Sequence, residues 1–131
     1  MIKKVSISDR LINFIVDTLA FTIIAIITII ILKNSNQNFK YYNVNYNRLL
    51  AFTIYFSYYF IFELVFSSTI GKLVTSTKVV DSSTLLRPSV VKLIIRTLCR
   101  FIPFEFVSIF FNDKNLPLHD ILSRTTVIKK P

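Results

Sequence analysis

Residues 11–32 read LINFIVDTLAFTIIAIITIIIL, an apolar stretch of 22 residues that carries a single charged side chain, Asp17. A helix of this length is about 33 Å long, which exceeds the hydrocarbon core of a bilayer at about 30 Å. Fifteen of the 22 residues are Leu, Ile, Phe or Val. Their favourable transfer free energies outweigh the cost of about 2.5–3.5 kcal/mol for one intramembrane acid. The stretch therefore predicts a membrane-spanning helix.

A cleaved signal peptide is the alternative interpretation of this stretch, because Lys3 and Lys4 precede it. The apolar run is longer than the hydrophobic region of a signal peptide, about 7–15 residues. The residues that follow, KNSN at 33–36, offer no small-residue cleavage site. We therefore interpret residues 11–32 as an uncleaved spanning helix.

Residues 49–66 predict a second spanning helix, about 27 Å long and more polar than the first because it carries Tyr55, Tyr58, Tyr59 and Glu63. A polar, Asn-rich loop separates the two stretches. The single glycine of the chain, Gly71, follows the second stretch closely. We expect it to adopt the left-handed conformation that commonly ends a helix.

The composition excludes three other classes of protein. Hydrophobic residues make up 53% of the 131 residues, so a water-soluble domain of this size would expose large apolar patches. The 13 Phe and 6 Tyr residues exclude a disordered chain, and the lone Cys99 excludes an internal disulfide scaffold. The formal charge of +9 lies mostly outside the apolar stretches and comes with no recognition motif, so we expect no nucleic acid partner.

The remainder of the chain predicts short elements. Residues 98–111 are apolar but span only about 21 Å as a helix, and Pro103 and Glu105 interrupt them. We expect a re-entrant or interfacial helix there, with a third membrane span as the alternative. The β-branched residues of 75–81 and 125–129 predict two short strands that pair with each other.

Basic residues predict the orientation. Three precede residue 11, five lie in residues 72–96 and four follow residue 111, against three in the polar loop 33–48. Cytoplasmic segments carry an excess of Lys and Arg, so two spans with both termini inside place twelve of these residues on the cytoplasmic side. The predicted fold is thus one all-α membrane domain over residues 1–131, with two transmembrane helices, the third apolar helix and a small cytoplasmic two-strand element.

Two polar stripes cross the predicted spans. Arg10, Asn13 and Asp17 are spaced three and four apart and share one helix face, which must turn toward protein or water. Glu63 and Tyr59 form the second stripe. Since Arg10 lies two turns from Asp17, we expect Asp17 to find its partner elsewhere, with Arg96 and Arg100 as candidates. The predicted buried network contains Asp17, Glu63, Tyr59, Arg96 and Arg100.

This network has two interpretations. Its charges either fix the packing of the helices or form an ion or proton relay. Metal binding and hydrolase chemistry are not expected, because the single His119 lies in no spaced ligand cluster and no nucleophile elbow is present. We expect Asp120, beside it, to cap the amides of a helix or turn. We expect no enzymatic activity and no cofactor.

The motifs together resemble the RDD family of small bacterial membrane proteins, named for one Arg and two Asp. Arg10 and Asp17 are similar to the family's Arg and first Asp. Asp120, in LHDILSRTTVI, is similar to the second Asp. The segments TIGK (69–72), KVVD (78–81) and Arg96 through IPFE (102–105) follow the family's intervening pattern. This sequence has Ser82-Ser83 where the family often has Gly after Val-Val-Asp.

The resemblance implies a location in the bacterial inner membrane and a transport-like role, with cation/proton exchange suggested for some members. Two spans cannot enclose a solvated pathway, so transport would require a homo-oligomer or a membrane partner in the lipid bilayer. Our first hypothesis is such a transport component, in which Asp17 and Glu63 hold exchangeable protons or cations. The second is a structural or accessory membrane protein whose buried charges only fix helix packing.

Overall fold

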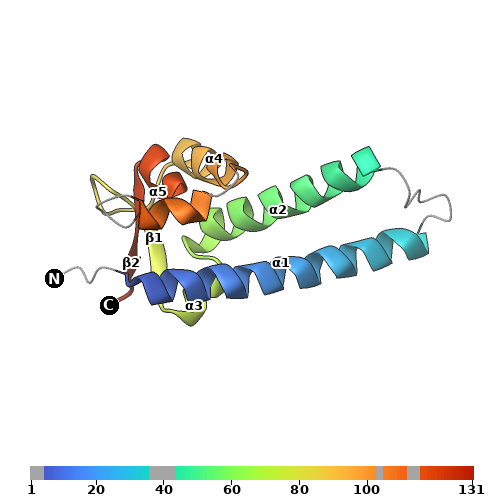
Figure 1. Cartoon of the computed structure of the whole chain (residues 1–131), viewed down its shortest axis with the longest axis horizontal. Coiled ribbons are helices and arrows are strands. Elements are labelled where there is room, and N and C mark those ends of the chain that lie inside the picture. Colours follow the sequence, from blue (N-terminus) through green and yellow to red (C-terminus); the bar gives the residue numbers. More distant parts are fainter. Residues whose placement is uncertain (1–4, 36–43, 103–104, 112–115) are drawn as a thin grey trace.

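The computed structural model describes residues 5–35, 44–102, 105–111 and 116–131. These residues form an antiparallel pair of long helices that carries a compact cap at one end (Figure 1). In chain order the elements are α1 (Ile7–Ser35), α2 (Val44–Phe66), α3 (Ile70–Val74), β1 (Thr77–Asp81), α4 (Val90–Cys99), the 3-10 helix η1 (Glu105–Phe110), α5 (Leu118–Leu122) and β2 (Thr125–Lys129).

The two long helices confirm the predicted apolar helices and extend beyond them. Helix α1 starts at Ile7 because the Ser6 hydroxyl accepts the Asp9 amide at 3.1 Å, while the Asp9 carboxylate accepts the Ser6 hydroxyl at 2.9 Å. This reciprocal pair satisfies groups that a helix start leaves open. The predicted limits followed apolar residues, whereas backbone hydrogen bonding continues into the polar flanks.

Both long helices turn apolar residues outward. They are the two helices within the described residues that are long and apolar enough to span a membrane, and only 6% and 17% of their most apolar windows are buried. The buried residues of α1 are Arg10, Asn13 and Asp17, all of them polar. The core helix of a water-soluble protein shows the opposite distribution, so the surface of this pair fits a lipid environment.

Hydroxyl groups within these helices are satisfied locally. Four threonine hydroxyls donate a hydrogen bond of 2.7–2.9 Å to the carbonyl oxygen four residues earlier. They belong to Thr18, Thr22, Thr28 and Thr53. Because lipid offers no hydrogen-bond partners, such bonding allows threonine to occur in an apolar helix at little cost.

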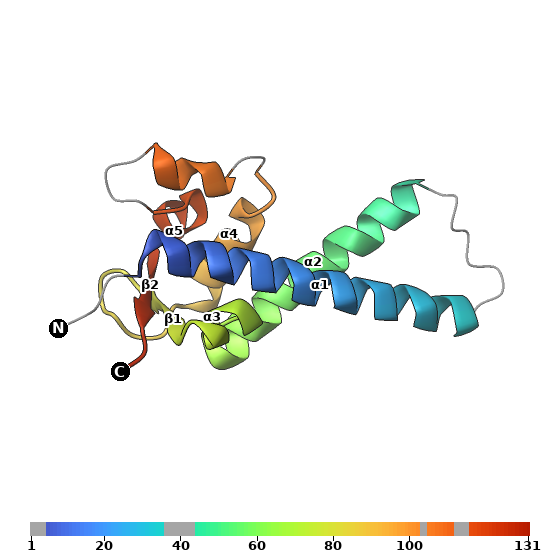
Figure 2. The ribbon, with the colours of Figure 1, turned by 60° about the horizontal axis from the view of Figure 1, so that its bottom comes forward.

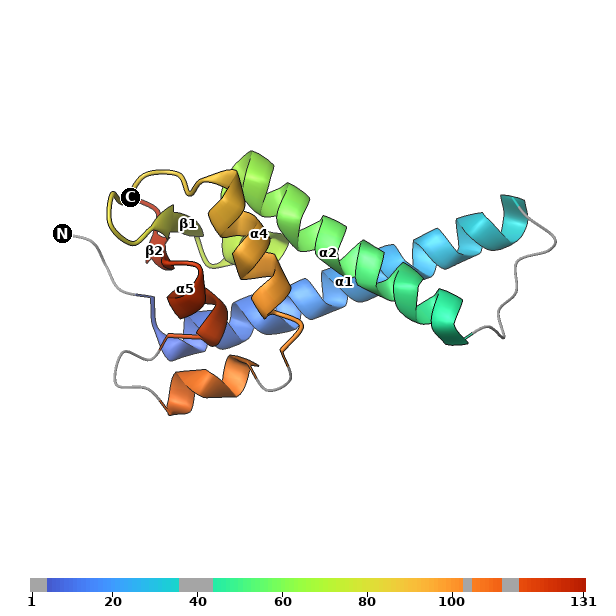
Figure 3. The same ribbon diagram turned by 90° about the horizontal axis from the view of Figure 1, so that it is seen from above.

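The cap places β1 and β2 beside the end of the helix pair. The two strands are antiparallel, with Val79 opposite Val127, which confirms the predicted pairing. Strand β1 begins two residues later than predicted, because Ser76 has a positive φ of 53° and forms the turn before it. Helix α4 lies between α2 and α5 (Figure 3).

Two sequence predictions about the cap need revision. Residues 98–111 do not form one helix, since α4 ends at Cys99 and η1 is a separate short element, so a third re-entrant helix is not confirmed. The predicted left-handed role of Gly71 is wrong. Ser67 ends α2 with a φ of 53°, and Gly71 lies inside α3 without a positive φ.

Gly71 is required by close packing instead. Helix α3 lies against α1 (Figure 2), and a Cβ atom added to Gly71 would be 2.4 Å from the backbone oxygen of Asn13 and 2.9 Å from its Cα. Both obstructing atoms belong to a helix backbone, which cannot yield as a side chain can. The absence of a side chain at Gly71 therefore sets the distance between α3 and α1.

We predict that Gly71→Ala separates α3 from α1 and lowers the free energy of unfolding by about 1–3 kcal/mol. The matched control is Leu73→Ala in the same short helix, whose side chain is 45% exposed and whose truncation leaves the contact intact. Thermal unfolding in detergent micelles measures both. Equal melting temperatures for Gly71→Ala and the native protein would contradict the packing argument.

Candidate functional site

The buried face of α1 opens onto a cluster of charged side chains under the cap. Arg10, Asn13 and Asp17 are 8%, 7% and 2% exposed, which confirms that the predicted stripe turns inward. With its amide oriented so that nitrogen faces acceptors, Asn13 donates to the Gly71 carbonyl at 2.8 Å and the Thr75 hydroxyl at 2.6 Å. The stripe thus fixes α1 on the segment that contains α3.

Glu63, fully buried at the end of α2, accepts hydrogen bonds from three cations. Lys72 Nζ lies 2.8 Å and Arg100 Nη2 lies 2.9 Å from its Oε1 atom. Arg96 Nε lies 3.2 Å from Oε1 and 3.0 Å from Oε2. Arg96 and Arg100, which the sequence placed in one network with Glu63 but assigned to Asp17, thus contact Glu63, and the sequence interpretation missed Lys72.

Asp120 joins the same cluster from α5. Its Oδ2 atom accepts Arg10 Nη1 at 2.9 Å, and its Oδ1 atom accepts Arg96 Nη1. The Asp120 carboxylate does not cap helix amides as predicted, because α5 follows Pro117 and has no side-chain cap. Arg96 thus bridges the two acids Glu63 and Asp120, and Arg10 connects α1 to the bridge.

Asp17 accepts hydrogen bonds from a different set of donors. The Tyr58 hydroxyl and the Gly71 backbone N–H each donate to Oδ1 at 2.8 Å, and the Thr69 hydroxyl donates to Oδ2 at 2.6 Å. Within the described part of the chain, Asp17 forms no ion pair. The prediction that Arg96 or Arg100 pairs with Asp17 is therefore wrong.

The turn after α2 positions the neutral hydrogen-bond donors of Asp17. Thr69 caps α3 and accepts the Lys72 amide at 3.5 Å, while its own proton is directed to the carboxylate. Because the first turn of a helix has unsatisfied N–H groups, it stabilises a carboxylate without a cation. Tyr59, which the sequence interpretation selected, instead places its ring 4.1 Å from the Arg100 guanidinium carbon. Its neighbour Tyr58 was missed.

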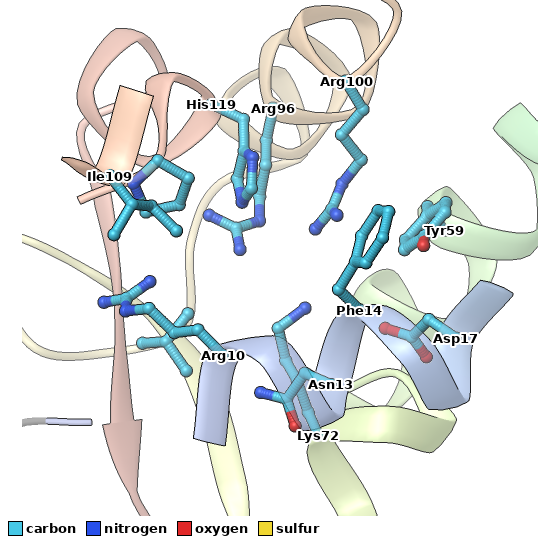
Figure 4. A pocket seen from close by; sticks show the side chains of 12 residues that line it. Arg10, Asn13, Phe14, Asp17, Tyr59, Lys72, Arg96, Arg100, Ile109 and His119 are labelled. Atoms are coloured by element: carbon cyan, nitrogen blue, oxygen red, sulfur yellow. The ribbon is translucent and has the colours of Figure 1, made fainter. Parts of the chain in front are cut away.

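A cavity of about 40 Å³ lies between these groups, and both stripes contribute to its wall. Figure 4 shows Arg96 and Arg100 extending into it from α4, Arg10 and Asn13 from α1, and the Lys72 ammonium from α3. Asp17 also lines it. By the measure that one water needs about 10–15 Å³, the cavity has room for about three water-sized groups.

Burial and nearby cations affect the titration of the basic groups around the cavity. Burial, followed by the charges of Arg100, Arg96, Lys72 and Arg10, holds the pKa of His119 well below its usual 6.5. Nε2 of His119 lies 3.4 Å from Asp120 Oδ1, but the low pKa leaves the ring neutral, so this contact is not an ion pair. Burial also lowers the pKa of Lys72, in spite of the contact with Glu63.

Metal ligands do not gather in this site. Among the described residues, no group of three or more His, Cys, Asp and Glu side chains is arranged to hold a metal ion.

A pair of helices long and apolar enough to span a membrane, together with a buried Arg–Asp cluster, is consistent with a membrane-associated helical domain. The chain matches the RDD family over residues 4–124. Because this match covers most of the chain, the protein belongs to the RDD family. No curated protein and no solved structure matches it. The residues similar to the family's Arg and second Asp are the ion pair Arg10–Asp120, and the residue similar to the first Asp is Asp17.

We predict that Glu63→Gln lowers the free energy of unfolding by about 3–5 kcal/mol, because it leaves Lys72, Arg96 and Arg100 buried without their shared anion. Asp9→Asn is the matched control, since it removes an acid whose pair with Lys129 is partly exposed and costs about 0–1 kcal/mol. Melting temperatures in detergent compare them. A similar loss for both variants would show that burial of Glu63 does not govern the effect.

We predict that His119 makes the protein less stable in acid. The folded state keeps the ring neutral, whereas the unfolded state binds a proton below about pH 6.5. The free energy of unfolding therefore decreases as the pH is lowered through this range. Between pH 7.5 and 5.5 the native protein should lose about 1.4 kcal/mol more than His119→Gln. Parallel unfolding curves of the two proteins at both pH values measure the difference. Identical losses would indicate that the folded ring accepts a proton.

Proposed function

We propose that this RDD protein is a component of membrane transport and that the cavity under the cap holds the transported ligand or proton. The observation that carries the proposal is Asp17, a buried acid in a spanning helix whose ligands are all neutral. Neutralising such an acid leaves no cation buried alone, which is the main cost of disrupting an internal ion pair.

Glu63 is not part of the proposed exchange, although the sequence hypothesis assigned it an exchangeable proton or cation. Three cationic side chains occupy its oxygens, so protonation would leave all three uncompensated. Asp120 is held by Arg10 and Arg96 in the same way. Asp17 is therefore the acid in this cluster that can lose its charge at the lowest cost.

We further propose a bacterial inner-membrane location with two crossings and both termini cytoplasmic. Support comes from the excess of basic residues outside the apolar stretches and from the cap, where α1 begins and β2 lies at the same end of the helix pair (Figure 1). Two helices cannot surround a solvated pathway, so the proposal requires a homo-oligomer or a membrane partner.

A structural or accessory role is the second candidate. It is favoured by the ion pairs that connect α1, α2, α4 and α5, since removing one partner of a buried pair is strongly destabilising. In this role the cavity would take no part in transport. The proposal includes no enzymatic activity, cofactor or metal.

We predict that Asp17→Asn abolishes flux while the protein still folds. An asparagine oxygen in the Oδ1 position still accepts from the Gly71 amide and the Tyr58 hydroxyl, and the Thr69 hydroxyl can rotate to accept from the asparagine nitrogen. The measurement is proton movement and ligand-driven flux in vesicles that contain the purified protein, under imposed Na⁺, K⁺ and anion gradients. We expect a decrease of about 10²–10⁴-fold, the contribution that a proton transfer group typically makes.

The matched control is Asp9→Asn, the same acid-to-amide change at the start of α1 and outside the cavity, which should retain native flux. If the native protein moves no ion or proton under any gradient, the transport proposal fails. If Asp17→Asn transports as the native protein does, the buried charges have the structural role.

A further inference from the structure

The cavity wall contains more cationic than acidic side chains. Of the charged residues that the structure describes on this wall, four are cationic, namely Arg10, Lys72, Arg96 and Arg100, and one is acidic, Asp17. Such a wall attracts a small anion and repels a cation.

Arg96 shows where such an anion would bind. Its Nε and Nη1 atoms are used by Glu63, Asp120 and Thr125, whereas Nη2 is buried and has no hydrogen-bond acceptor in the described part of the chain. Arg96 is 0% exposed, and its guanidinium extends into the cavity beside His119 (Figure 4). A buried guanidinium N–H without an acceptor is rare in proteins, where such groups are nearly always satisfied.

We infer that the cavity is a binding site for one small monovalent anion, a halide or a carboxylate of the size of formate, held by Arg96 Nη2 and the surrounding cations. The inference rests on the proposed function in one respect, because it names the class of ligand for the same cavity. Four cations on the wall attract an anion, and the volume of about 40 Å³ has room for an ion of about three heavy atoms, which is less than a larger organic acid needs.

The walls of the cavity support this class of ligand. Ile109 and Val127 provide an apolar side, which disfavours a strongly hydrated divalent anion such as sulfate. The pKa of His119 is lowered first by burial and then by the charges of Arg100, Arg96, Lys72 and Arg10, which agrees with the cationic wall. That wall would repel an inorganic cation, so the cavity itself is not suited to Na⁺ or K⁺.

The experiment measures binding without transport. The full chain is purified in detergent in a gluconate buffer of constant ionic strength and titrated with chloride or formate, and gluconate and sulfate serve as larger or divalent controls. A ligand that binds only the folded state raises the melting temperature with a saturating dependence on concentration. Binding of radiolabelled chloride provides a second, direct measurement.

We expect saturable binding of chloride and formate but not of gluconate or sulfate. Arg96→Lys removes Nη2 and should weaken the affinity about tenfold or more, since a hydrogen bond to a charged group is lost. Ile109→Phe fills the cavity without changing its charge and should abolish binding. Arg87→Gln is the matched control, because it removes a cation that lies outside the cavity wall, and its affinity should stay within twofold of the native value.

The outcomes are distinct. A melting temperature that rises without saturation, or equally with gluconate, overturns the inference, as does an affinity unchanged in Ile109→Phe. If Arg96→Lys does not fold, Ile109→Phe and the anion selectivity of the native protein decide the question. Anion binding without flux in vesicles retains the inference and removes the transport proposal. Cation or proton flux without anion binding does the reverse.

Discussion

Arg96 is the side chain on which the arrangement of the cap depends. It lies on α4 at 0% exposure and donates to Glu63 on α2 and to Asp120 on α5. A buried guanidinium requires acceptors with good geometry, so these helices can pack only where both carboxylates reach it. Arg10 then binds the second oxygen of Asp120, and this contact draws the start of α1 to the same point. One buried cation therefore determines the relative positions of four helices.

The cost of burying this cluster also explains its location. The outer surfaces of α1 and α2 are apolar, and the buried charged residues of these helices lie at the end that meets the cap. There, α3, α4 and α5 cover the charges and provide further ligands, which the lipid interior could not do. The cap serves as the polar interior that a pair of membrane helices cannot form alone, and a cavity remains where four cationic side chains converge.

Regular spacing made part of this arrangement predictable. Arg10, Asn13 and Asp17 share a helix face, and the cost of exposing that face to lipid was sufficient to predict its burial. The abundance of β-branched residues likewise predicted two short strands, and these pair as β1 and β2. Charge also predicted that Glu63, Arg96 and Arg100 belong to one buried network, although it did not predict that both arginines contact Glu63.

The ligands of Asp17 could not be predicted on the same grounds. Opposite charge favoured Arg96 or Arg100 as the partner of Asp17, but the actual donors are two hydroxyls and a backbone amide. Such groups occur throughout the chain, so the sequence does not indicate which of them contact Asp17. Their selection depends on the close approach of α3 to α1, which Gly71 allows and which only the three-dimensional packing reveals. The contacts of Asp17 are therefore set by the packing of the backbone, whereas Glu63 and Asp120 are held by the cations that neutralise them.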